Sequence, residues 1–412
     1  MKLSSEKASG QALFALFLLI FLLVPVSRAR AEEVALNAQI GGDLNNTRYV
    51  AFLSKKVDYR IFYMADPYRI VIDLPEVEIQ VPAGKGRGLV LASRSGLFAP
   101  GKSRIVIDLV EPARVEKSEL QPPRNDVPAR LVLDLARSTH KTFLAAAKTL
   151  PPPREAARSP ADGKGSSDKR PLIVVDPGHG GPDAGALGRL TGTPEKEVTL
   201  DFCKTLYEKL EATGRYRVVM TRSVDIFVPL DERAEMAAGP KAALLISIHA
   251  DALDPKRWGI KGLQEVRGGT VYTLSEEASD EQANVVAQNE NKADLQAGLT
   301  SEQSPLTVSA EITTIINDLE NRIKKNRSSA LANFLTEKLK EKMKLNIRPH
   351  RSANLRVLKG VGVPSVLIEL GYLSNDEDEK LLTSKEWRAS TATYLAEAVN
   401  AFMMAHQDHI PL

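Results

Sequence analysis

Three side chains that can bind a metal and carry protons follow apolar runs in the second half of the chain. His179 follows the run "LIVVD", His249 lies near the end of "LLISIHA", and Glu369 lies near the end of "PSVLIEL". Imidazole and carboxylate groups are zinc ligands, and both also act as general acids and bases. A charged group at the end of a buried strand costs free energy unless it is paired or metal-bound. The three residues therefore indicate a site that combines metal binding with proton transfer.

The turn that carries His179 is rich in glycine and reads "VVDPGHGGPDAGALG" over residues 174–188. One interpretation is a tight surface turn in which the histidine packs or forms a hydrogen bond. The other is a metal ligand whose neighbouring glycines let the backbone approach metal and substrate closely. His249 strengthens the second interpretation, because two histidines at strand ends are better evidence for a metal site than one. His350 is not expected to belong to this site.

The sequence predicts a histidine and carboxylate donor set, since the one cysteine cannot build a cysteine-based zinc site. Cys203 lies on the apolar stripe of a predicted helix and is expected to be a small core residue. Glu195, in "GTPEKEVTL", begins that helix and could turn back toward His179. Two alternatives stay open for this position. Glu197 competes for the role, and a carboxylate at a helix N-terminus is also favoured by the helix dipole.

The elements that would position these residues form an α/β domain with a mostly parallel sheet flanked by helices, over residues 171–408. Strands and helices alternate there, and the apolar runs are typical of strands covered on both faces. Open sheets of this class place their sites beyond the carboxyl ends of strands. The strands are expected at 171–176, 216–221, 242–250, 268–275, 355–359 and 364–371, and the helices at 196–213, 229–239, 277–297, 309–343 and 384–406.

The block before this domain, residues 33–137, predicts an all-β sandwich that acts as a binding module. Short runs rich in Val, Ile and Leu are separated by Pro, Gly, Asn and Asp. A common pattern recurs in "RIVIDLP" at 69–75, "RIVIDLV" at 104–110 and "RLVLDLA" at 130–136, which suits similar strands in two sheets. Residues 138–170 are dominated by Pro, Ser, Gly and charged residues, and this composition predicts a flexible linker.

The first 31 residues have the pattern of a signal peptide. Lys2 and Lys7 precede an apolar run at 12–26, and small residues follow at Ala29 and Ala31. The run is short for a membrane span, so we expect cleavage and export, with no stable membrane span afterwards. The alternative is an uncleaved signal anchor. The formal net charge of +3 gives no indication of nucleic-acid binding.

The motifs "DPGHGG", "EKEVTL", "SIHAD" and "PSVLIELGYLSN" occur in this order, and with them residues 171–405 resemble a known family. It is that of the zinc-dependent N-acetylmuramoyl-L-alanine amidases of the cell-separation type. The resemblance implies Zn²⁺ bound by His179, Glu195 and His249, with Glu369 as the catalytic carboxylate. Its implied substrate is peptidoglycan, cut between N-acetylmuramic acid and the L-alanine of the stem peptide.

Three further residues are candidates for supporting roles in such a site. Asp176 and Asp251 could orient ligands from behind, and the alternative for both is local capping of turns. Arg233, in "LDERAEM", fits a position that is commonly basic in the family. It is expected to form either a structural ion pair or a substrate contact.

A polar insertion at 277–305 is longer than a simple crossover needs, and "ENKAD" at 290–294 resembles the helix that covers the active site of cell-separation amidases. The hypothesis is that Glu290 fills the open zinc position until an activator with a LytM-type domain moves the helix. The alternative is a solvated helix with ordinary surface charge. The following helix carries an apolar stripe that is expected to pack on the domain or receive the activator: Ile312, Ile315, Ile316, Leu319 and Ile323.

The β-rich block resembles the AMIN domain through "DPYRIVIDLP" and "GLFAPGKSRIVIDL". That resemblance implies targeting to the division site or the cell wall through residues 33–137, in an exported protein expected to be periplasmic. Two other functions remain open at this point. One is a zinc endopeptidase that cuts within stem peptides, and the other is a non-catalytic wall-binding scaffold.

Overall fold

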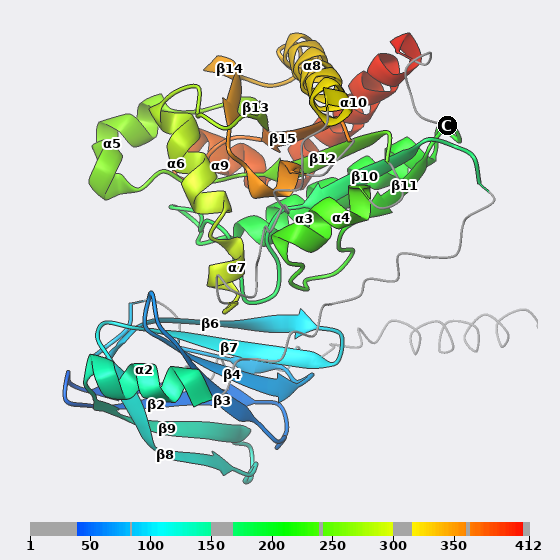
Figure 1. The fold of residues 1–412 in the computed structure, drawn as a ribbon. Helices are drawn as coiled ribbons and strands as arrows, with labels where there is room; N and C mark the ends of the chain where they lie inside the picture. The colour runs from blue at the N-terminus through cyan, green and yellow to red at the C-terminus, as the bar shows by residue number, and fades with distance from the viewer. Residues whose placement is uncertain are drawn as a thin grey trace, which may run out of the picture. The chain divides into compact units, whose positions relative to one another are not determined.

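The fold was analysed in a computed structural model that describes residues 39–82, 85–149, 168–238, 242–299, 315–359 and 363–406 (Figure 1). These residues belong to one compact unit that spans Asn37–Leu412. The predicted signal peptide lies outside the described residues. Among the helices that are described, none has the length and apolar character needed to cross a membrane.

The N-terminal sandwich consists of two antiparallel sheets, as the alternating runs predict. One has the order β1-β2-β9-β8 with β5 paired to β2, and the other has the order β3-β4-β7-β6. Leucine, isoleucine and valine side chains from both sheets form the core between them. The strands are β1 (Gln39–Gly42), β2 (Asn46–Leu53), β3 (Arg60–Met64), β4 (Arg69–Pro75), β5 (Ile79–Gln80), β6 (Val90–Ala99), β7 (Lys102–Leu109), β8 (Ala113–Gln121) and β9 (Ala129–Arg137).

A helix, α2 (His140–Thr149), occupies the start of the segment that was expected to be linker. Phe143 is buried against the sandwich core and contacts the rings of Tyr63 and Tyr68 edge to face. This packing attaches α2 to the sandwich, although proline and charged residues dominate the sequence that follows. Residues 150–167 of the expected linker lie outside the described residues.

The C-terminal domain has a six-stranded sheet in the order β11-β10-β12-β15-β13-β14, with helices on both faces (Figure 1). All its strand pairs are parallel except β13 with β15, which confirms the predicted, mostly parallel α/β fold. The strands are β10 (Leu172–Pro177), β11 (Arg217–Met220), β12 (Leu244–His249), β13 (Gly269–Leu274), β14 (Leu345–Ala353) and β15 (Ser365–Glu369).

The two faces of this sheet are covered by different helices. On one face, α3 (Glu195–Glu211), α8 (Ile315–Leu339) and α10 (Lys385–Ala405) bury their apolar residues against the strands, and Cys203 is buried there as expected. On the other face lie α4 (Leu230–Ala238), α6 (Glu281–Glu290), α7 (Ala293–Gln296) and the 3₁₀ helix η1 (Arg356–Leu358). Helices α5 (Pro255–Glu265) and α9 (Asp376–Thr383) complete the domain.

Two details of the predicted elements are wrong. Residues 355–359 were expected to be a strand but contain η1, and the strand at that edge is β14. Its sequence "LNIRPHRSA" has no apolar run, because β14 is an edge strand with Ile347 exposed. Ile323, from the expected apolar stripe of α8, is exposed, so of the two expected roles it does not pack on the domain. The other members of that stripe lie outside the residues whose side chains are described.

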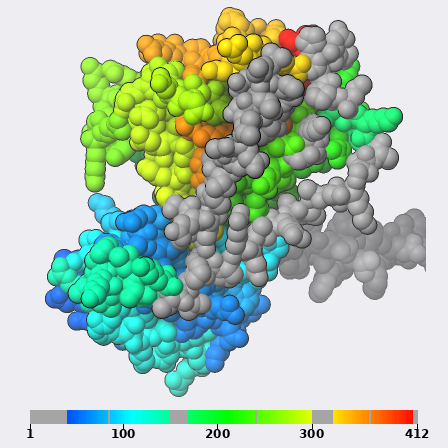
Figure 2. Space-filling model, in the orientation of Figure 1, coloured from blue at the N-terminus to red at the C-terminus, as the bar shows by residue number. Residues whose placement is uncertain are grey.

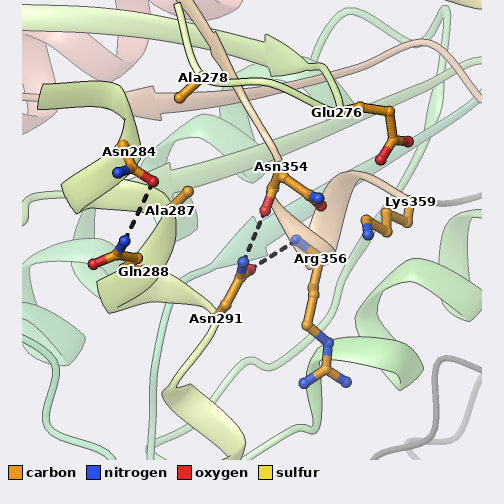
Figure 3. Close-up of a pocket in the computed structure, with 9 residues that line it drawn as sticks. All are labelled: Glu276, Ala278, Asn284, Ala287, Gln288, Asn291, Asn354, Arg356 and Lys359. Atoms are coloured by element: carbon orange, nitrogen blue, oxygen red, sulfur yellow. Dashed lines mark hydrogen bonds between the residues drawn. The ribbon is translucent and has the colours of Figure 1, made fainter. Parts of the chain in front are cut away.

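The outer side of α6 lies at the molecular surface, where Figure 2 shows this segment in yellow-green. A cavity of about 370 Å³ lies between α6 and the turn from β14 into η1 (Figure 3). At its edge, the Asn291 side chain donates to the carbonyl oxygen of Asn354 at 2.7 Å and accepts from the backbone N–H of Arg356 at 2.9 Å. These bonds attach the C-terminal end of α6 to η1.

Candidate metal and catalytic site

The carboxyl ends of β10, β12 and β15 meet at one edge of the sheet. Pro177 pairs with Ile248, and His249 pairs with Glu369, in parallel registers. His179 follows β10 by two residues, so the parallel arrangement brings it to the same edge. The structure therefore brings His179, His249 and Glu369 together as the strand order predicts.

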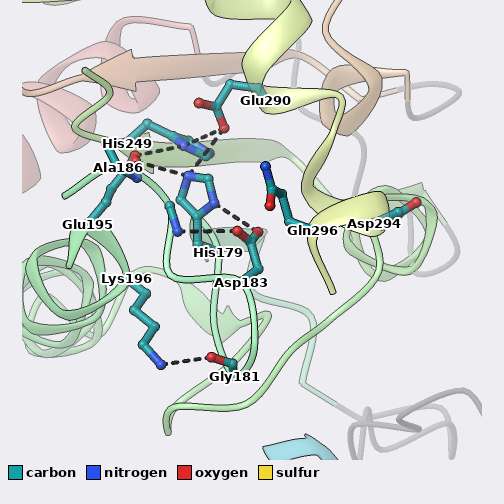
Figure 4. Close-up of polar contacts among 12 residues, drawn as sticks. His179, Gly181, Asp183, Ala186, Glu195, Lys196, His249, Glu290, Asp294 and Gln296 are labelled. Atoms are coloured by element: carbon teal, nitrogen blue, oxygen red, sulfur yellow. Dashed lines mark hydrogen bonds and ion pairs between the residues drawn. The ribbon is translucent and has the colours of Figure 1, made fainter. Parts of the chain in front are cut away.

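Four buried side chains converge there: His179, Glu195, His249 and Glu290 (Figure 4). Each offers a nitrogen or oxygen ligand atom, and these atoms all lie within 4.8 Å of one another. Nε2 of His179 lies 3.1 Å from Oε2 of Glu195, and Nδ1 of His249 lies 2.8 Å from Oε2 of Glu290. Two imidazoles and two carboxylates at this spacing form a donor set for a metal ion.

Glycine makes room for the side chains of this cluster. A Cβ at Gly178 would lie 2.3 Å from Cε1 of His249. At Gly185, where φ is +66°, it would lie 2.6 Å from Cδ2 of His179 and 2.7 Å from Oε2 of Glu195. His179 itself has φ of +61°, which is uncommon for a residue other than glycine. The turn thus holds His179 in a conformation that the surrounding structure must impose.

Glu195 begins α3, and its carboxylate is held by backbone donors on both sides. Its Oε1 accepts from the N–H of Ala250 at 2.7 Å, and Oε2 accepts from the N–H of Ala186 at 2.9 Å. The side chain is fully buried, whereas Glu197, the alternative considered for this position, is exposed. The geometry therefore places Glu195, and not Glu197, beside the two histidines.

Asp183 is a site residue that the sequence reasoning missed. Its Oδ2 lies 2.9 Å from Nδ1 of His179, and both side chains are buried. Burial opposes ionisation of Asp183, but the neighbouring imidazole outweighs it and lowers the pKa of this carboxyl group. With Nδ1 engaged, Nε2 of His179 faces the cluster. A carboxylate on the far nitrogen orients many metal-binding histidines, so an acidic residue four positions after the histidine was a usable signal.

The electrostatics of the cluster fit a bound cation. Nε2 of His179 is buried and has no hydrogen-bond partner among the described residues, although Glu195 and Glu290 oxygens lie within 3.4 Å. For His249, burial opposes the charged form, but Glu290 and Glu195 outweigh it and raise its pKa to about 10. The carboxylates thus stabilise positive charge at this point strongly. The residues present can therefore hold a metal ion.

Glu369 lies beside this cluster with one oxygen fixed and the other available. Its Oε2 accepts from the N–H of Asp251 at 2.9 Å, while Oε1 is buried without a hydrogen-bond partner in the described part of the chain. Burial raises the pKa of Glu369 well above its usual value; His249 opposes this shift, and the charges of Glu290 and Asp251 reinforce it. A carboxyl group whose pKa is raised in this way is suited to accept a proton and release it again.

Asp176 and Arg233 form a buried ion pair behind the turn. NH1 of Arg233 lies 2.9 Å from Oδ1 of Asp176, and its NH2 donates to the carbonyl oxygen of His179 at 2.8 Å. Thr221 and Ser247 donate to the same carboxylate. Of the two roles considered for Arg233, the structure supports the structural ion pair. Asp176 is linked to the backbone of the turn through Arg233, which also donates to the carbonyl oxygen of Pro177 at 2.7 Å.

Glu290 reaches the cluster because α6 ends beside it. The next residue, Asn291, is bound to η1 as described above, and the preceding Asn289 donates to Oδ2 of Asp251 at 3.3 Å. Burial raises the pKa of Asp251 well above its usual value, and the carboxylates of Glu290 and Glu195 add to the shift. The end of α6 is thus anchored on both sides of Glu290, by Asn289 to Asp251 and by Asn291 to η1.

The site can now be compared with known proteins. A family model described as N-acetylmuramoyl-L-alanine amidase matches residues 173–401, which contain all these residues. The chain belongs to this amidase family. The N-acetylmuramoyl-L-alanine amidase AmiC of Neisseria meningitidis is 30% identical over 408 residues, covering 93% of this chain and 94% of the relative. AmiA of Escherichia coli is 36% identical over 241 residues, 58% of this chain and 78% of AmiA.

Among solved structures, the amidase AmiC2 of Nostoc punctiforme is similar at 26% identity and a TM-score of 0.39, over 57% of this chain and 97% of that one.

Among the histidines considered in the sequence of the present chain, His350 lies apart from the site. It is on β14, where its ring contacts Thr273 and Asn333.

Proposed function

We propose that this amidase hydrolyses the amide bond between the lactyl group of N-acetylmuramic acid and the L-alanine of the peptidoglycan stem peptide. The observation that carries the proposal is the buried set of His179, Glu195 and His249 beside Glu369. Three protein ligands with room for a fourth are the mark of a catalytic zinc site, whereas structural sites are closed by four. Zinc bound there would act as a Lewis acid that polarises the scissile carbonyl and makes water more acidic.

Glu369 is the general base and acid in this proposal. Its free Oε1 would take a proton from the attacking water, and its raised pKa suits the return of that proton to the leaving amine. The backbone N–H of Asp251 holds the other oxygen, so the carboxyl group is already oriented. Asp183 would fix the ring of His179, and Arg233 would fix the backbone of the turn.

In this proposal Glu290 is the fourth metal ligand, and by occupying that position it keeps the resting enzyme inhibited. Its Oε2 lies 2.8 Å from Nδ1 of His249 and 3.4 Å from Nε2 of His179. A carboxylate in that place would close the donor set and exclude both water and substrate carbonyl. Residues 281–299, called the inhibitory segment from here on, would have to move before peptidoglycan could bind. The natural trigger we propose is a protein activator, for which a LytM-type domain is the candidate.

The setting we propose is the exported cell-wall compartment, the periplasm, during separation of daughter cells. The N-terminal sandwich would bring the enzyme to the wall or the division site. The full-length relative from Neisseria meningitidis, which aligns over nearly the whole of this chain, supports the pairing of such a module with the amidase domain.

The test is a digest of purified peptidoglycan followed by mass analysis of the released peptides. It compares the wild type, Glu290→Ala and the double variant Glu290→Ala/Glu369→Ala, each loaded with zinc. Intact stem peptides that begin at L-alanine, released by Glu290→Ala and not by the double variant, are the expected products. Cleaved cross-links would indicate an endopeptidase, and absence of products from every variant would indicate a scaffold. Calorimetric zinc binding in all three separates loss of metal from loss of catalysis.

A further inference from the structure

One sheet of the N-terminal sandwich is buried on both faces. Along β4 and β7, Ile70, Ile72, Ile105 and Ile107 point into the sandwich core. The alternate residues point to the outer face, where Val71 and Val106 are fully buried and form a second apolar cluster with Phe62 and Met64. Antiparallel sheets usually leave one face to solvent. Gly298 of the inhibitory segment lies on this outer face, where a Cβ would be 3.1 Å from Val106 and 3.2 Å from Val71.

Two arginines of this outer face bind three successive carbonyl groups of the inhibitory segment. Arg94 Nε donates to the carbonyl oxygen of Gln296 at 2.6 Å. Arg104 NH1 donates to those of Gly298 at 2.9 Å and Ala297 at 3.3 Å. These carbonyls belong to the last residue of α7 and the two residues after it, and backbone acceptors at a helix end lack partners within the helix. Arg104 is fully buried, and Asp73 holds its other nitrogens at 2.6 and 3.0 Å.

An apolar contact lies beside these hydrogen bonds. Phe98 and Ala99, at the end of β6, form a buried cluster with Phe227, Ala297 and Leu299. The rings of Phe98 and Phe227 are stacked with centroids 5.8 Å apart, and the guanidinium carbon of Arg104 lies 3.4 Å from the Phe98 centroid. The surface therefore has both a directional polar part and an apolar part, as specific interfaces do.

The held residues are coupled to Glu290 by a short, fixed connection. Gln296 lies six positions after Glu290, and four of those positions belong to α7. Within α7, Oδ1 of Asp294 accepts from the N–H of Leu230 at 3.0 Å, and its Oδ2 lies 3.2 Å from NH1 of Arg356. Because the connection is helical and anchored, Glu290 cannot swing far from the site while Gln296–Leu299 stay bound.

We propose that the outer face of β4, β6 and β7 is the docking surface for the end of the inhibitory segment, and that the sandwich thereby holds the enzyme closed. The surface, called the latch surface below, consists of Arg94, Phe98, Arg104, Val71 and Val106. This inference rests on the proposed inhibition by Glu290. It gives the sandwich a second role, inside the molecule, beside attachment to the wall.

A second contact brings the same strand to the loop that carries His179. The backbone N–H of Phe227 donates to the carbonyl oxygen of Leu97 at 3.0 Å. Gly96 lies so close to Gly181 that a Cβ on Gly96 would be 2.3 Å from the Gly181 carbonyl carbon. Strand β6, which carries Arg94 and Phe98, thus also contacts the catalytic domain outside the inhibitory segment.

The test uses the full chain with zinc and no activator. The variants Arg94→Ser and Phe98→Ser each remove one part of the latch surface. Asp108, the partner of Arg94 in the sandwich, keeps its bond to Arg69 at 2.7 Å, so the sheet retains its own ion pair. The matched control is Arg48→Ser, which breaks an exposed ion pair with Asp134 on the other sheet. Release of dye-labelled peptidoglycan measures activity, and hydrogen exchange over 281–299 measures opening.

Both latch variants should raise basal hydrolysis about tenfold and should speed exchange over 281–299. Arg94→Ser loses one charge-assisted hydrogen bond, and Phe98→Ser loses a buried apolar contact. Arg48→Ser should leave both measurements unchanged. The double variant Glu290→Ala/Phe98→Ser should hydrolyse peptidoglycan no faster than Glu290→Ala alone, because the single substitution has already removed the inhibited state.

Three results would overturn the inference or what it rests on. If Glu290→Ala is activated while folded Arg94→Ser and Phe98→Ser exchange and react like the wild type, the latch is refuted and the inhibition by Glu290 stands. If Glu290→Ala itself is no faster than the wild type, the proposed inhibition is refuted and the latch with it. Activation of Arg48→Ser to the same degree would also refute a specific latch.

Discussion

Oε2 of Glu290 lies 2.8 Å from Nδ1 of His249, so the last residue of α6 occupies the site formed at the carboxyl end of β12. This contact joins an element of the insertion to a fully buried strand of the sheet. It determines how the site can be tested, because any change in Glu290 alters both the donor set and the access to it.

Glu290→Gln is expected to raise basal amidase activity, since a neutral amide is a much weaker zinc ligand than a carboxylate. An increase of about tenfold or more in the rate of peptidoglycan solubilisation without activator is expected, with little loss of zinc. Glu281→Gln, an exposed position on the same helix, is the control. Equal rates for Glu290→Gln and the wild type would contradict the inhibitory role.

Glu369→Gln should abolish catalysis while leaving the metal in place. Loss of a general acid–base typically lowers the rate by about 10²–10⁴-fold. The measurement is the rate in the Glu290→Gln background, together with the zinc content of the purified protein. The matched control is Glu197→Gln, the same substitution at an exposed position of α3, which should leave the rate unchanged. A Glu369→Gln variant that retains more than a tenth of the rate would exclude this residue as the base.

Asp183→Asn should weaken zinc binding without unfolding the domain. The amide keeps the size of the side chain but loses the charge that stabilises the orientation of His179. Changes of this kind commonly reduce metal affinity about 10–100-fold. Competition with a fluorescent chelator measures the affinity, and thermal unfolding of the metal-free protein checks the fold. An unchanged affinity would show that Asp183 only shapes the turn.

Zinc binding should depend steeply on pH and release protons. In the metal-free protein the pKa of His249 is raised to about 10, and that of His179 is raised well above its usual value. His249 is therefore protonated at pH 7, and a metal must displace that proton. Affinity should rise with pH up to about 10 and fall as pH decreases. Calorimetry in two buffers of different ionisation enthalpy measures the number of protons released when zinc binds. Release of no protons at pH 7 would contradict the raised pKa of His249.

The sequence was informative where function depends on local pattern. His179, His249 and Glu369 could be placed together because apolar runs mark buried strands, and parallel strands bring their carboxyl ends to one edge. Glu290 was found only through the resemblance to a family, since nothing in "NENKAD" itself points to a metal. The edge strand β14 was missed because it lacks the apolar run of a covered strand.

The latch surface could not have been predicted from the sequence. Arg94 and Arg104 look like ordinary charged residues of a β-strand, and their carbonyl partners carry no side-chain signal. The contact joins residues about 200 positions apart. Only the folded chain shows that Gln296–Leu299 meet the outer face of the sandwich sheet.

The apolar face of α6 has one more consequence. Ala283, Val286 and Ala287 are buried with Tyr272 and Leu367 of the sheet, so an outward movement of the helix exposes part of a core. Burial of a single valine side chain is worth about 1.5–3 kcal/mol, and this cost persists for as long as the helix is out. An open enzyme is therefore stable only while another surface covers what was exposed. The rate of hydrolysis should therefore rise with the concentration of the molecule that supplies this covering surface. Hydrolysis should stop when that molecule dissociates from the enzyme.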